Sequence, residues 1–495
     1  MPLSLLHESV APFDPKFTGG ENNFIKRSLW SPDGSAILTV SEDACVRLFA
    51  LPAQTIDALQ GSAEQPQATP LLPWAAIAEP EGIADCCWLP QMKWEDPSSC
   101  VFACAARGQP VHLWSASTGV LCGSFMPMDN AEEVSSPFSL AFYRDGSVLY
   151  SGHSSCVRLF DTQRPGRQTE QWTLATRKGR EGLKGIVSAI APPVGEGAGA
   201  AGLCAVGSYS RKIALMDRKS RPRGGVKRAE AVLQREGGMG GVTSLQWLET
   251  GGEGVGGDMY LLSGHRKDNA LRLWDLRSYD TPVCEYPRTV ATHQKFQFDC
   301  LPIARLQKER QKTKGGQGGI GETSEVPMET DTETETETGV VVATGTQEGG
   351  VLFYGAPNGG PLAAAPAHFS PSTGCSFHPT LPLLLTSSGT RETVAQSGGK
   401  HVSSSSESES DREEGLGHSD GDGSKARRGE MGAGNRGVGR ERKRAKAESP
   451  EATESTGKSQ EETDTCYQPV NALRVWLVDC ALLADCLAKN EKTGD

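Results

Sequence analysis

Long apolar segments and paired cysteines are missing from this sequence of 495 residues. No apolar run reaches the roughly 18–20 residues that a membrane-spanning helix needs, so the sequence predicts no membrane anchor. The N-terminal stretch Met-Pro-Leu-Ser-Leu-Leu-His-Glu lacks the basic start and the long apolar core of a signal peptide. The 14 cysteines include no Cys-x-x-Cys pair, which favours buried thiols in a reducing compartment over zinc sites or disulfides.

Catalytic signatures are missing as well. The sequence contains no recognisable Ser/His/Asp set, paired-carboxylate signature or P-loop lysine. Residues 316–321 fit the pattern Gly-x-Gly-x-x-Gly, but no predicted strand precedes them and no helix follows, as a dinucleotide site requires. His153 and His265 each follow Ser-Gly at a predicted turn, and we interpret them as turn or rim histidines rather than metal ligands. We therefore expect no enzymatic activity, no metal, no cofactor and no small-molecule substrate.

What the sequence does contain is an internal repeat. Short β-type runs that end in an aromatic residue or Met recur at residues 46–49, 111–114, 157–160, 213–216, 271–274, 351–354 and 473–476. Most are preceded by a small-residue strand and a turn, and further upstream by a third strand. This order is typical of a WD-repeat blade, and Trp274-Asp275 is the signature dipeptide itself. The sequence therefore predicts an all-β fold, a seven-bladed WD-repeat β-propeller.

The last two intervals between runs hold far more chain than the roughly 40–45 residues of a bare repeat. The excess lies at 304–339, rich in Thr-Glu pairs, and at 390–468, rich in Ser, Glu, Gly and Arg. Such compositions cannot bury enough apolar surface to fold, so we expect disordered insertions in blades six and seven. The propeller is expected to span 24–479, and 480–495 to form a tail. Residues 1–23 should supply the missing outer strand of the last blade, within 3–16, which removes an open sheet edge.

The charge balance limits the kinds of nucleic-acid contact that are plausible. A net charge of −11 argues against a generic, sequence-independent nucleic-acid binder, although it permits a local basic surface. The second insertion carries a basic run with Arg440, Arg442, Lys443, Arg444 and Lys446. We interpret this run as a nuclear import signal; the alternative is an ordinary solvated charge run.

Several sequence blocks do not belong to the generic WD repeat. They include Arg164-Pro-Gly-Arg167, Arg266-Lys-Asp268, Thr292-His-Gln-Lys-Phe-Gln-Phe-Asp299 and His378-Pro-Thr-Leu-Pro. Together, in this order between about residues 22 and 479, they resemble the telomerase Cajal body protein family. The chain differs from that family in the length of its two insertions and in a nearly absent N-terminal extension.

The resemblance implies a scaffold without enzymatic activity that binds small Cajal body RNAs and telomerase RNA. The implied partners are H/ACA ribonucleoprotein (RNP) proteins and telomerase. The implied role is to carry these RNPs to Cajal bodies in support of telomere maintenance. The implied location is the nucleus and its Cajal bodies, with some cytoplasmic protein.

A WD-repeat scaffold separates the basic residues onto two faces. One face carries the turns between second and third strands and the loops between blades. It is expected to present Arg107, Lys178, Arg180, Lys184, Arg211, Lys212, Arg266, Lys267 and Lys295, with Tyr209 as the base-stacking candidate. The opposite face is the second candidate, with Arg164, Arg167, Arg218, Lys219, Arg221, Arg223, Lys227 and Arg228. Asp43 and Asp268 occupy turns where WD repeats place a structural Asp that hydrogen-bonds neighbouring loops.

A rival function belongs to another class. Trp274-Asp275-Leu276-Arg277 matches the WD-x-Arg motif by which propeller substrate receptors dock on cullin–RING ubiquitin ligases. Because Trp-Asp closes a WD blade in any case, a single copy of this motif is weak support. Bound H/ACA RNA would favour the scaffold, whereas adaptor and cullin subunits without RNA would favour the receptor.

Overall fold

A computed structural model describes residues 2–60, 69–176, 182–193, 202–222, 225–235, 238–248, 260–302, 339–391 and 469–492. Nearly all of the two predicted insertions, the basic run at 440–446, and Lys178, Arg180 and Arg223 lie outside these ranges. Within them the regular structure is almost entirely strand, with two helices, α1 (Ala53–Gln60) and α3 (Cys480–Lys492).

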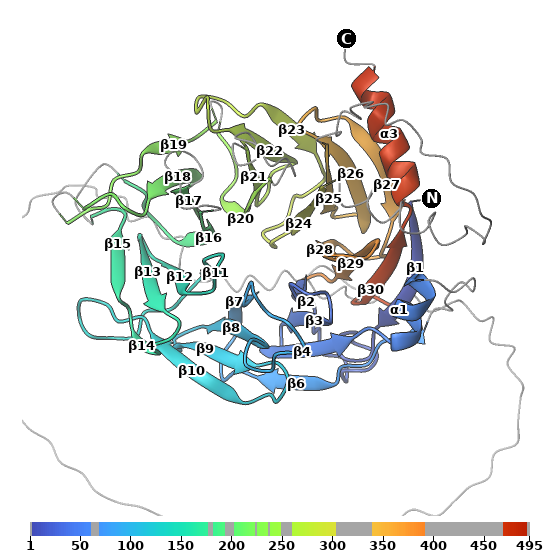
Figure 1. Cartoon of the computed structure of the whole chain (residues 1–495), viewed down its shortest axis with the longest axis horizontal. Coiled ribbons are helices and arrows are strands. Elements are labelled where there is room, and N and C mark those ends of the chain that lie inside the picture. Colours follow the sequence, from blue (N-terminus) through green and yellow to red (C-terminus); the bar gives the residue numbers. More distant parts are fainter. Residues whose placement is uncertain are drawn as a thin grey trace, which may run out of the picture. The chain divides into compact units, whose positions relative to one another are not determined.

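The strands form seven sheets around a ring (Figure 1). Blade one contains β2 (Ile25–Trp30), β3 (Ala36–Ser41), β4 (Cys45–Ala50) and β6 (Ala75–Ala78). Blade two contains β7 (Ile83–Trp88), β8 (Val101–Ala106), β9 (Val111–Ser115), β10 (Leu121–Met126) and the short β14 (Gly166–Arg167). Blade three contains β11 (Ser139–Phe142), β12 (Val148–His153), β13 (Cys156–Asp161) and β15 (Glu170–Thr173).

The remaining blades follow in chain order. Blade four contains β16 (Val187–Ala191), β17 (Leu203–Ser208), β18 (Lys212–Asp217) and β19 (Ala231–Leu233). Blade five contains β20 (Val242–Trp247), β21 (Tyr260–His265), β22 (Ala270–Asp275) and β23 (Cys284–Pro287). Blade six contains β24 (Phe298–Pro302), β25 (Val340–Gly345), β26 (Gly350–Ala356) and β27 (Pro361–Pro366). Blade seven contains β28 (Ser372–Phe377), β29 (Leu383–Ser388), β30 (Leu473–Val478), β1 (Leu3–Ser9) and β5 (Thr69–Pro70). The predicted seven-bladed β-propeller is confirmed.

The apolar core is divided among the interfaces between neighbouring blades. Each of the seven core clusters draws its side chains mainly from two adjacent blades. Leu38 of blade one packs in the same cluster as Phe102 of blade two, and Leu215 of blade four in the same cluster as Trp274 of blade five. Because both faces of each blade are covered, the second strands read as continuous apolar or small-residue runs rather than as alternating patterns.

The ring closes between the last strand and the N-terminal strand. β1 pairs antiparallel with β30, with Leu5 opposite Trp476, and β5 extends the same sheet on the far side of β1. Glu8 forms an ion pair with Arg474 at 2.6 Å, and His7 Nε2 lies 2.8 Å from the Thr55 hydroxyl of α1. These contacts cover an edge that would otherwise expose unpaired backbone groups.

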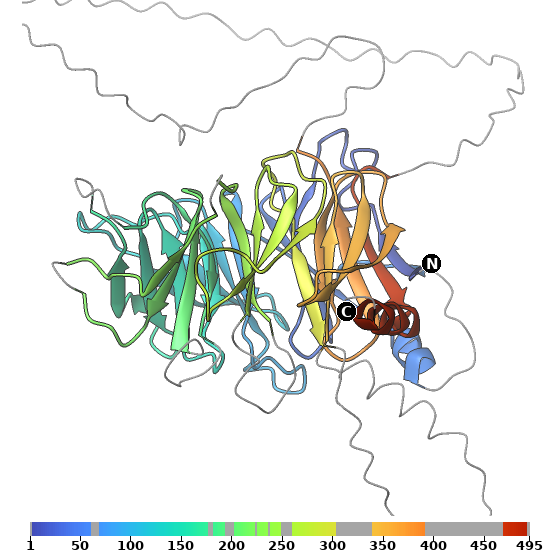
Figure 2. The same cartoon turned by 90° about the horizontal axis from the view of Figure 1, so that it is seen from above.

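The C-terminal helix packs on blade six. α3 contacts the outer strand β27, and its Leu483 and Leu487 belong to the core cluster between blades six and seven. A Cβ on Gly355 would lie 2.6 Å from Leu487 Cδ1, so a side chain at that position would force the Leu487 side chain to move. Figure 2 shows the helix lying across the outside of these strands.

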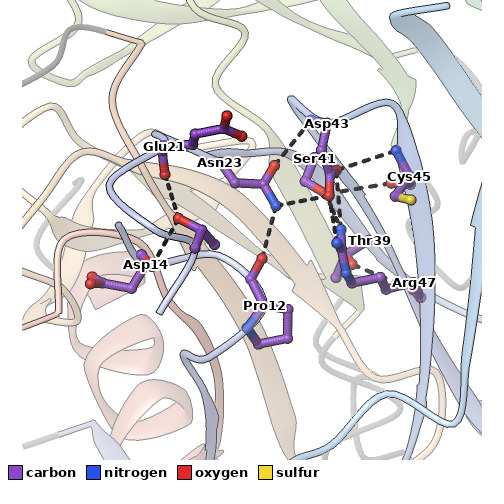
Figure 3. A network of polar contacts seen from close by, with 10 residues as sticks. Pro12, Asp14, Glu21, Asn23, Thr39, Ser41, Asp43, Cys45 and Arg47 are labelled. Carbon is purple, nitrogen blue, oxygen red and sulfur yellow. Dashed lines mark hydrogen bonds and ion pairs between the residues drawn. The ribbon is translucent and has the colours of Figure 1, made fainter. Parts of the chain in front are cut away.

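The predicted structural role of the turn aspartates is confirmed. Asp43 exchanges hydrogen bonds with Asn23 in the loop before β2, and it accepts hydrogen bonds from Ser41 and Arg47 (Figure 3). Asp268 accepts a hydrogen bond from Gly240 N in the loop before β20 and two from Arg272. Each aspartate thus ties its turn to the loop that enters the same blade.

The interpretation of His153 and His265 as turn or rim histidines is wrong. Both end buried strands, and each accepts or donates through both ring nitrogens: His265 contacts Ser263 Oγ and Gly240 O, and His153 contacts Ser151 Oγ and Ser136 O. Trp274 Nε1 donates to the same Ser263 hydroxyl at 2.8 Å. These histidines therefore supply, from the second strand, the polar link that WD repeats usually take from a Gly-His before the first strand.

Three negative findings apply to the described part of the chain. Its cysteines form no disulfide. No group of three or more His, Cys, Asp or Glu side chains is arranged to hold a metal ion. No helix in these ranges has the length and apolarity needed to cross a membrane.

Candidate nucleic-acid interface

The upper face of the propeller is defined here as the side that carries the turns between second and third strands and the loops between blades. On it, two neighbouring turns form the blade-four/five rim, which comprises Tyr209, Arg211, Lys212, Arg266 and Lys267. The first turn joins β17 to β18, where Ser208 pairs with Lys212. The second joins β21 to β22. Arg211 and Lys267 are exposed, and Tyr209, Lys212 and Arg266 are half-buried.

Two of these cations occupy backbone positions that favour glycine. Arg211 has a φ of 66° and Lys267 a φ of 51°. The corresponding turns of blades two and six carry glycines at positive φ, Gly108 and Gly349. A side chain in the left-handed region costs roughly 1–2 kcal/mol, so these two positions retain cations at a cost in stability. Ala44 and Ser155 adopt the same conformation in the turns of blades one and three, so the positive φ belongs to this turn type.

Tyr209 and Arg266 form the centre of the rim. The guanidinium carbon of Arg266 lies 4.3 Å from the centroid of the Tyr209 ring, so one face of the ring is already covered. Gly241 runs directly beside the pair, because a Cβ there would lie 3.1 Å from both Arg266 Nε and the Tyr209 backbone. The close passage of this loop restricts the pair, and both side chains are half-buried.

The nearest carboxylate does not neutralise the rim. Burial alone would raise the pKa of Asp268, but hydrogen bonds from Arg272 and from Gly240 N outweigh it and lower that pKa. Asp268 thus pairs with Arg272 at 2.7 Å and not with the neighbouring Arg266. Among the described residues, Arg211, Lys212, Arg266 and Lys267 form no ion pair. The rim therefore keeps four uncompensated positive charges within the described structure.

The other upper-face cations predicted from the sequence are dispersed. Lys184 is exposed beside the rim, since its backbone oxygen accepts a hydrogen bond from Ser208 Oγ. Lys295 lines the axial channel, where its Nζ lies 3.5 Å from Ser188 O. Arg107 is exposed on blade two, away from the rim.

The second candidate face is less coherent than the sequence indicated. Arg167 lies on β14 at the outer edge of blade two and pairs with Glu132, whereas Arg164 lies in the turn after β13. Arg218 and Arg221 are exposed in the turn after β18, with the Arg218 guanidinium 5.6 Å from the Tyr143 ring. Lys219 and Arg228 lie in the same connection.

The inclusion of Lys227 in that surface is wrong. Its side chain is fully buried, its Nζ donates to the carbonyls of Arg218 and Ser220, and it lies over the Trp172 ring at 4.4 Å. Lys227 therefore holds its own loop together and offers nothing to a ligand.

The sequence did not predict one candidate site. A cavity of about 490 Å³ opens along the propeller axis, lined in part by Arg27, Thr243, Gln246, Gln297 and Lys295. Only ring closure brings these residues together, because they come from different blades. The motif Thr292-His-Gln-Lys-Phe-Gln-Phe-Asp299, which does not belong to the generic repeat, is the sequence feature that points to this cavity.

Comparison with known proteins points to one family. The chain is 31% identical over 385 residues to Telomerase Cajal body protein 1 of Bos taurus, covering 76% of this chain and 61% of that protein. It is 31% identical over 382 residues to the Homo sapiens protein of the same name, covering 76% of this chain and 59% of that protein. The propeller belongs to the telomerase Cajal body protein family.

The chain thus spans about three fifths of the length of these curated relatives. A Schizosaccharomyces pombe protein named Guanine nucleotide-binding protein negative regulator 1 is also similar, with 30% identity over 262 residues, 52% of this chain and 60% of that protein. No family model matches the chain.

Proposed function

We propose that this propeller is a non-enzymatic, RNA-binding scaffold that recruits H/ACA-type small Cajal body RNPs and the telomerase RNP to Cajal bodies. Membership of the telomerase Cajal body protein family supports the connection with telomerase and Cajal bodies. The RNA itself is inferred from the chemistry of the upper face. The basic run at 440–446 supplies the nuclear address in this proposal.

The observation that carries the proposal is the blade-four/five rim. Arg211, Lys212, Arg266 and Lys267 present cations without carboxylate partners in the described structure, and Arg211 and Lys267 do so at strained positions. Lysine and arginine bind phosphates, while aromatic rings and guanidinium planes stack on unpaired bases. The Tyr209–Arg266 pair supplies such a stacking surface in the middle of these cations. This combination fits a single-stranded loop of RNA better than a uniform duplex.

The ubiquitin-ligase alternative receives little support. Arg277, the residue on which the WD-x-Arg motif depends, is bonded to Asp275 and donates to the Tyr260 hydroxyl. This arrangement is that of a residue closing its own turn. None of the curated relatives described above carries a name that refers to a ligase.

The test is to crosslink RNA to the full chain in cells, purify the protein and sequence the bound RNA. The proposal predicts H/ACA-class small RNAs, and a strong loss of these reads for the variant with Arg211, Lys212, Arg266 and Lys267 changed to Ala. A variant with Arg218, Lys219 and Arg221 changed to Ala is the matched control and should keep its reads. Adaptor and cullin subunits recovered without RNA would instead establish the ligase alternative.

A further inference from the structure

The loop that lines the axial cavity contacts the rim, because Lys267 N donates a hydrogen bond to the carbonyl of Thr292, the residue before His293. Its lining includes residues from the first strand of every blade, for example Arg27, Asp85, Leu140, Ser188 and Thr243. His293 and Arg391, both exposed, stand at its mouth. Its volume of about 490 Å³ lies within the range of about 300–1,000 Å³ that is usual for small-molecule pockets.

Three glutamines in this cavity have orientations that their partners fix. Gln297 Oε1 accepts from Ser28 N, which leaves its amide hydrogens to donate. Gln246 Nε2 donates to the Asp299 carboxylate, and Gln294 Nε2 donates to Gly389 O, so each of these leaves its Oε1 to accept. A backbone N–H can donate only to the oxygen of a glutamine amide, and a carboxylate or carbonyl can accept only from its NH₂ group. The cavity therefore presents one amide donor group and two amide acceptors in defined orientations.

Asp299 is the anchor for part of this arrangement. Its carboxylate accepts from Gln246, Ser376 Oγ and the backbone N–H groups of Cys300 and Phe377. Because these four donors already hydrogen-bond the carboxylate, we do not expect it to accept a hydrogen bond from a ligand. It joins blade six to blade seven and holds Gln246 from blade five.

Two hydroxyls in the wall have no partner. Thr243 is 6% exposed, and its Oγ1 has no hydrogen-bond partner among the described residues. Ser244 lies on the same strand and also lines the cavity, and its Oγ is likewise buried without a partner there. Neither hydroxyl is open to the cavity: Ser244 Oγ faces the next strand, since a Cβ on Gly264 would lie 2.6 Å from it, and both oxygens are shielded from solvent.

The cations of the cavity are not equivalent. Lys26 pairs with Glu42 at 2.6 Å, and Arg27 pairs with Asp85. Lys295 differs, because its Nζ contacts only the Ser188 carbonyl at 3.5 Å and meets no carboxylate within ion-pair distance in the described part of the chain. Burial lowers the pKa of Lys295, an effect that the nearby Tyr209 hydroxyl partly offsets.

We infer that the axial cavity receives one unpaired nucleotide, with its phosphate on Lys295 and its base against Gln246, Gln294 and Gln297. This inference rests on the proposed function, because it assigns the nucleotide to an RNA whose adjoining nucleotides cross the blade-four/five rim. The donors and acceptors of the glutamines suit the edge of a base, which carries both kinds of group. A free nucleotide has the same chemistry, and the experiment below separates the two sources.

The test uses the full chain and two kinds of probe. One is the set of 5′-monophosphates of adenosine, cytidine, guanosine and uridine, measured by isothermal titration calorimetry. The other is a fluorescein-labelled single-stranded RNA decamer of mixed sequence, measured by fluorescence anisotropy. A cavity variant combines Lys295→Gln and Gln246→Met, which keep side-chain size nearly constant. Lys93→Gln, which removes an exposed cation between β7 and β8 outside the cavity, is the matched control.

The inference predicts that at least one monophosphate binds the wild type, and that the cavity variant loses this binding. It also predicts that the cavity variant binds the decamer at least tenfold more weakly, while Lys93→Gln keeps both kinds of binding. Unchanged decamer binding by a folded cavity variant would overturn the inference and leave the proposed function standing. Monophosphate binding that is lost in the cavity variant, with decamer binding unchanged, would assign the cavity to a free nucleotide and overturn the inference.

A second readout protects the test against a variant that fails to fold. The wild-type protein is crosslinked by ultraviolet light to the decamer carrying 4-thiouridine, and the modified peptides are identified by mass spectrometry. Adducts within 242–247 or 293–297 support the inference. Adducts confined to 209–212 and 266–269 contradict it while supporting the proposed function.

Discussion

The Arg266 guanidinium carbon lies 4.3 Å from the centroid of the Tyr209 ring, and this contact joins the turns of blades four and five. A cation over an aromatic face at a partly exposed site contributes about 0.5–1 kcal/mol. The pair is therefore stable without a ligand, and it places two groups that stack on bases, a guanidinium and a phenol ring, at the half-buried surface of the rim. This surface lies among cations that no described carboxylate neutralises.

Removing the ring should weaken RNA binding without changing its salt dependence. We expect Tyr209→Ala to reduce the binding free energy for single-stranded RNA by about 1–3 kcal/mol, as for loss of one stacked base. Because no charge is removed, the slope of log K against log salt should stay the same. Tyr209→Phe keeps the ring and should bind like the wild type. Equal losses for both variants, measured by anisotropy at several salt concentrations, would contradict a stacking role.

The strain at Arg211 predicts an opposition between stability and binding. Arg211→Gly relieves a positive φ of 66°, so the free energy of unfolding should rise by up to about 1 kcal/mol, while RNA binding weakens. Ala44→Gly is the matched control, because Ala44 has a φ of 59° in the equivalent turn of blade one and no charge. It should stabilise the protein and leave RNA binding unchanged. Urea unfolding and anisotropy on the same samples decide this point.

Buried histidines should make the fold sensitive to mild acid. Burial lowers the pKa of His153 to about 3, and of His265 and His378 to about 4, from 6.5. Below pH 6.5 the unfolded chain therefore binds more protons than the folded chain. The free energy of unfolding should be constant above pH 7 and fall as the pH drops from 6.5 toward 4, by up to about 4 kcal/mol per pH unit for three groups.

The same linkage gives a variant test. His265→Gln loses the imidazole packing, so its free energy of unfolding at pH 7 should fall. It has no ionising imidazole, so the slope of that free energy against pH between 6 and 4.5 should decrease by the equivalent of about one proton. Urea titrations at four pH values measure both quantities. An unchanged slope in this variant would show that His265 is not the source of the acid sensitivity.

Closure through β1 predicts a large effect of an N-terminal deletion. Removing residues 1–16 strips the partner of β30 and exposes the edge that Leu3–Ser9 now cover, so thermal stability should drop and aggregation increase. Glu8→Gln removes only the carboxylate charge that pairs with Arg474 and is expected to cost about 1 kcal/mol or less. An unchanged melting temperature in the deletion variant would mean that β1 does not stabilise the ring.

The sequence predicted the seven-bladed architecture because the residues that end each third strand recur in a recognisable pattern. The aromatic or Met ends of the third strands, such as Phe49, Trp274 and Trp476, recur wherever neighbouring blades pack. The role of His153 and His265 was not predicted, because WD repeats usually carry this histidine in a Gly-His before the first strand. The motif Ser-Gly-His at 151–153 and 263–265 places an imidazole two residues from its serine partner on one strand, and this signal was available.

The candidate site was less accessible to sequence reasoning. Turn positions of Arg211 and Lys267 follow from hairpin register, but the burial of Lys227 under its own loop does not, since it depends on Trp172 from the neighbouring blade. The place of Arg167 depends on β14 adding to blade two rather than staying with blade three. The axial cavity depends on seven first strands meeting, which no local pattern records.

The most direct test of RNA binding at the blade-four/five rim is the salt dependence of the variant with Arg211, Lys212, Arg266 and Lys267 changed to Ala. Circular dichroism first establishes that this variant is folded. If all four side chains contact phosphates of single-stranded RNA, the slope of log K against log salt should flatten by about 0.7 per contact, roughly 3 in total. A folded quadruple variant with wild-type affinity and slope would contradict the account and move the interface to the Arg218–Arg221 side of the propeller.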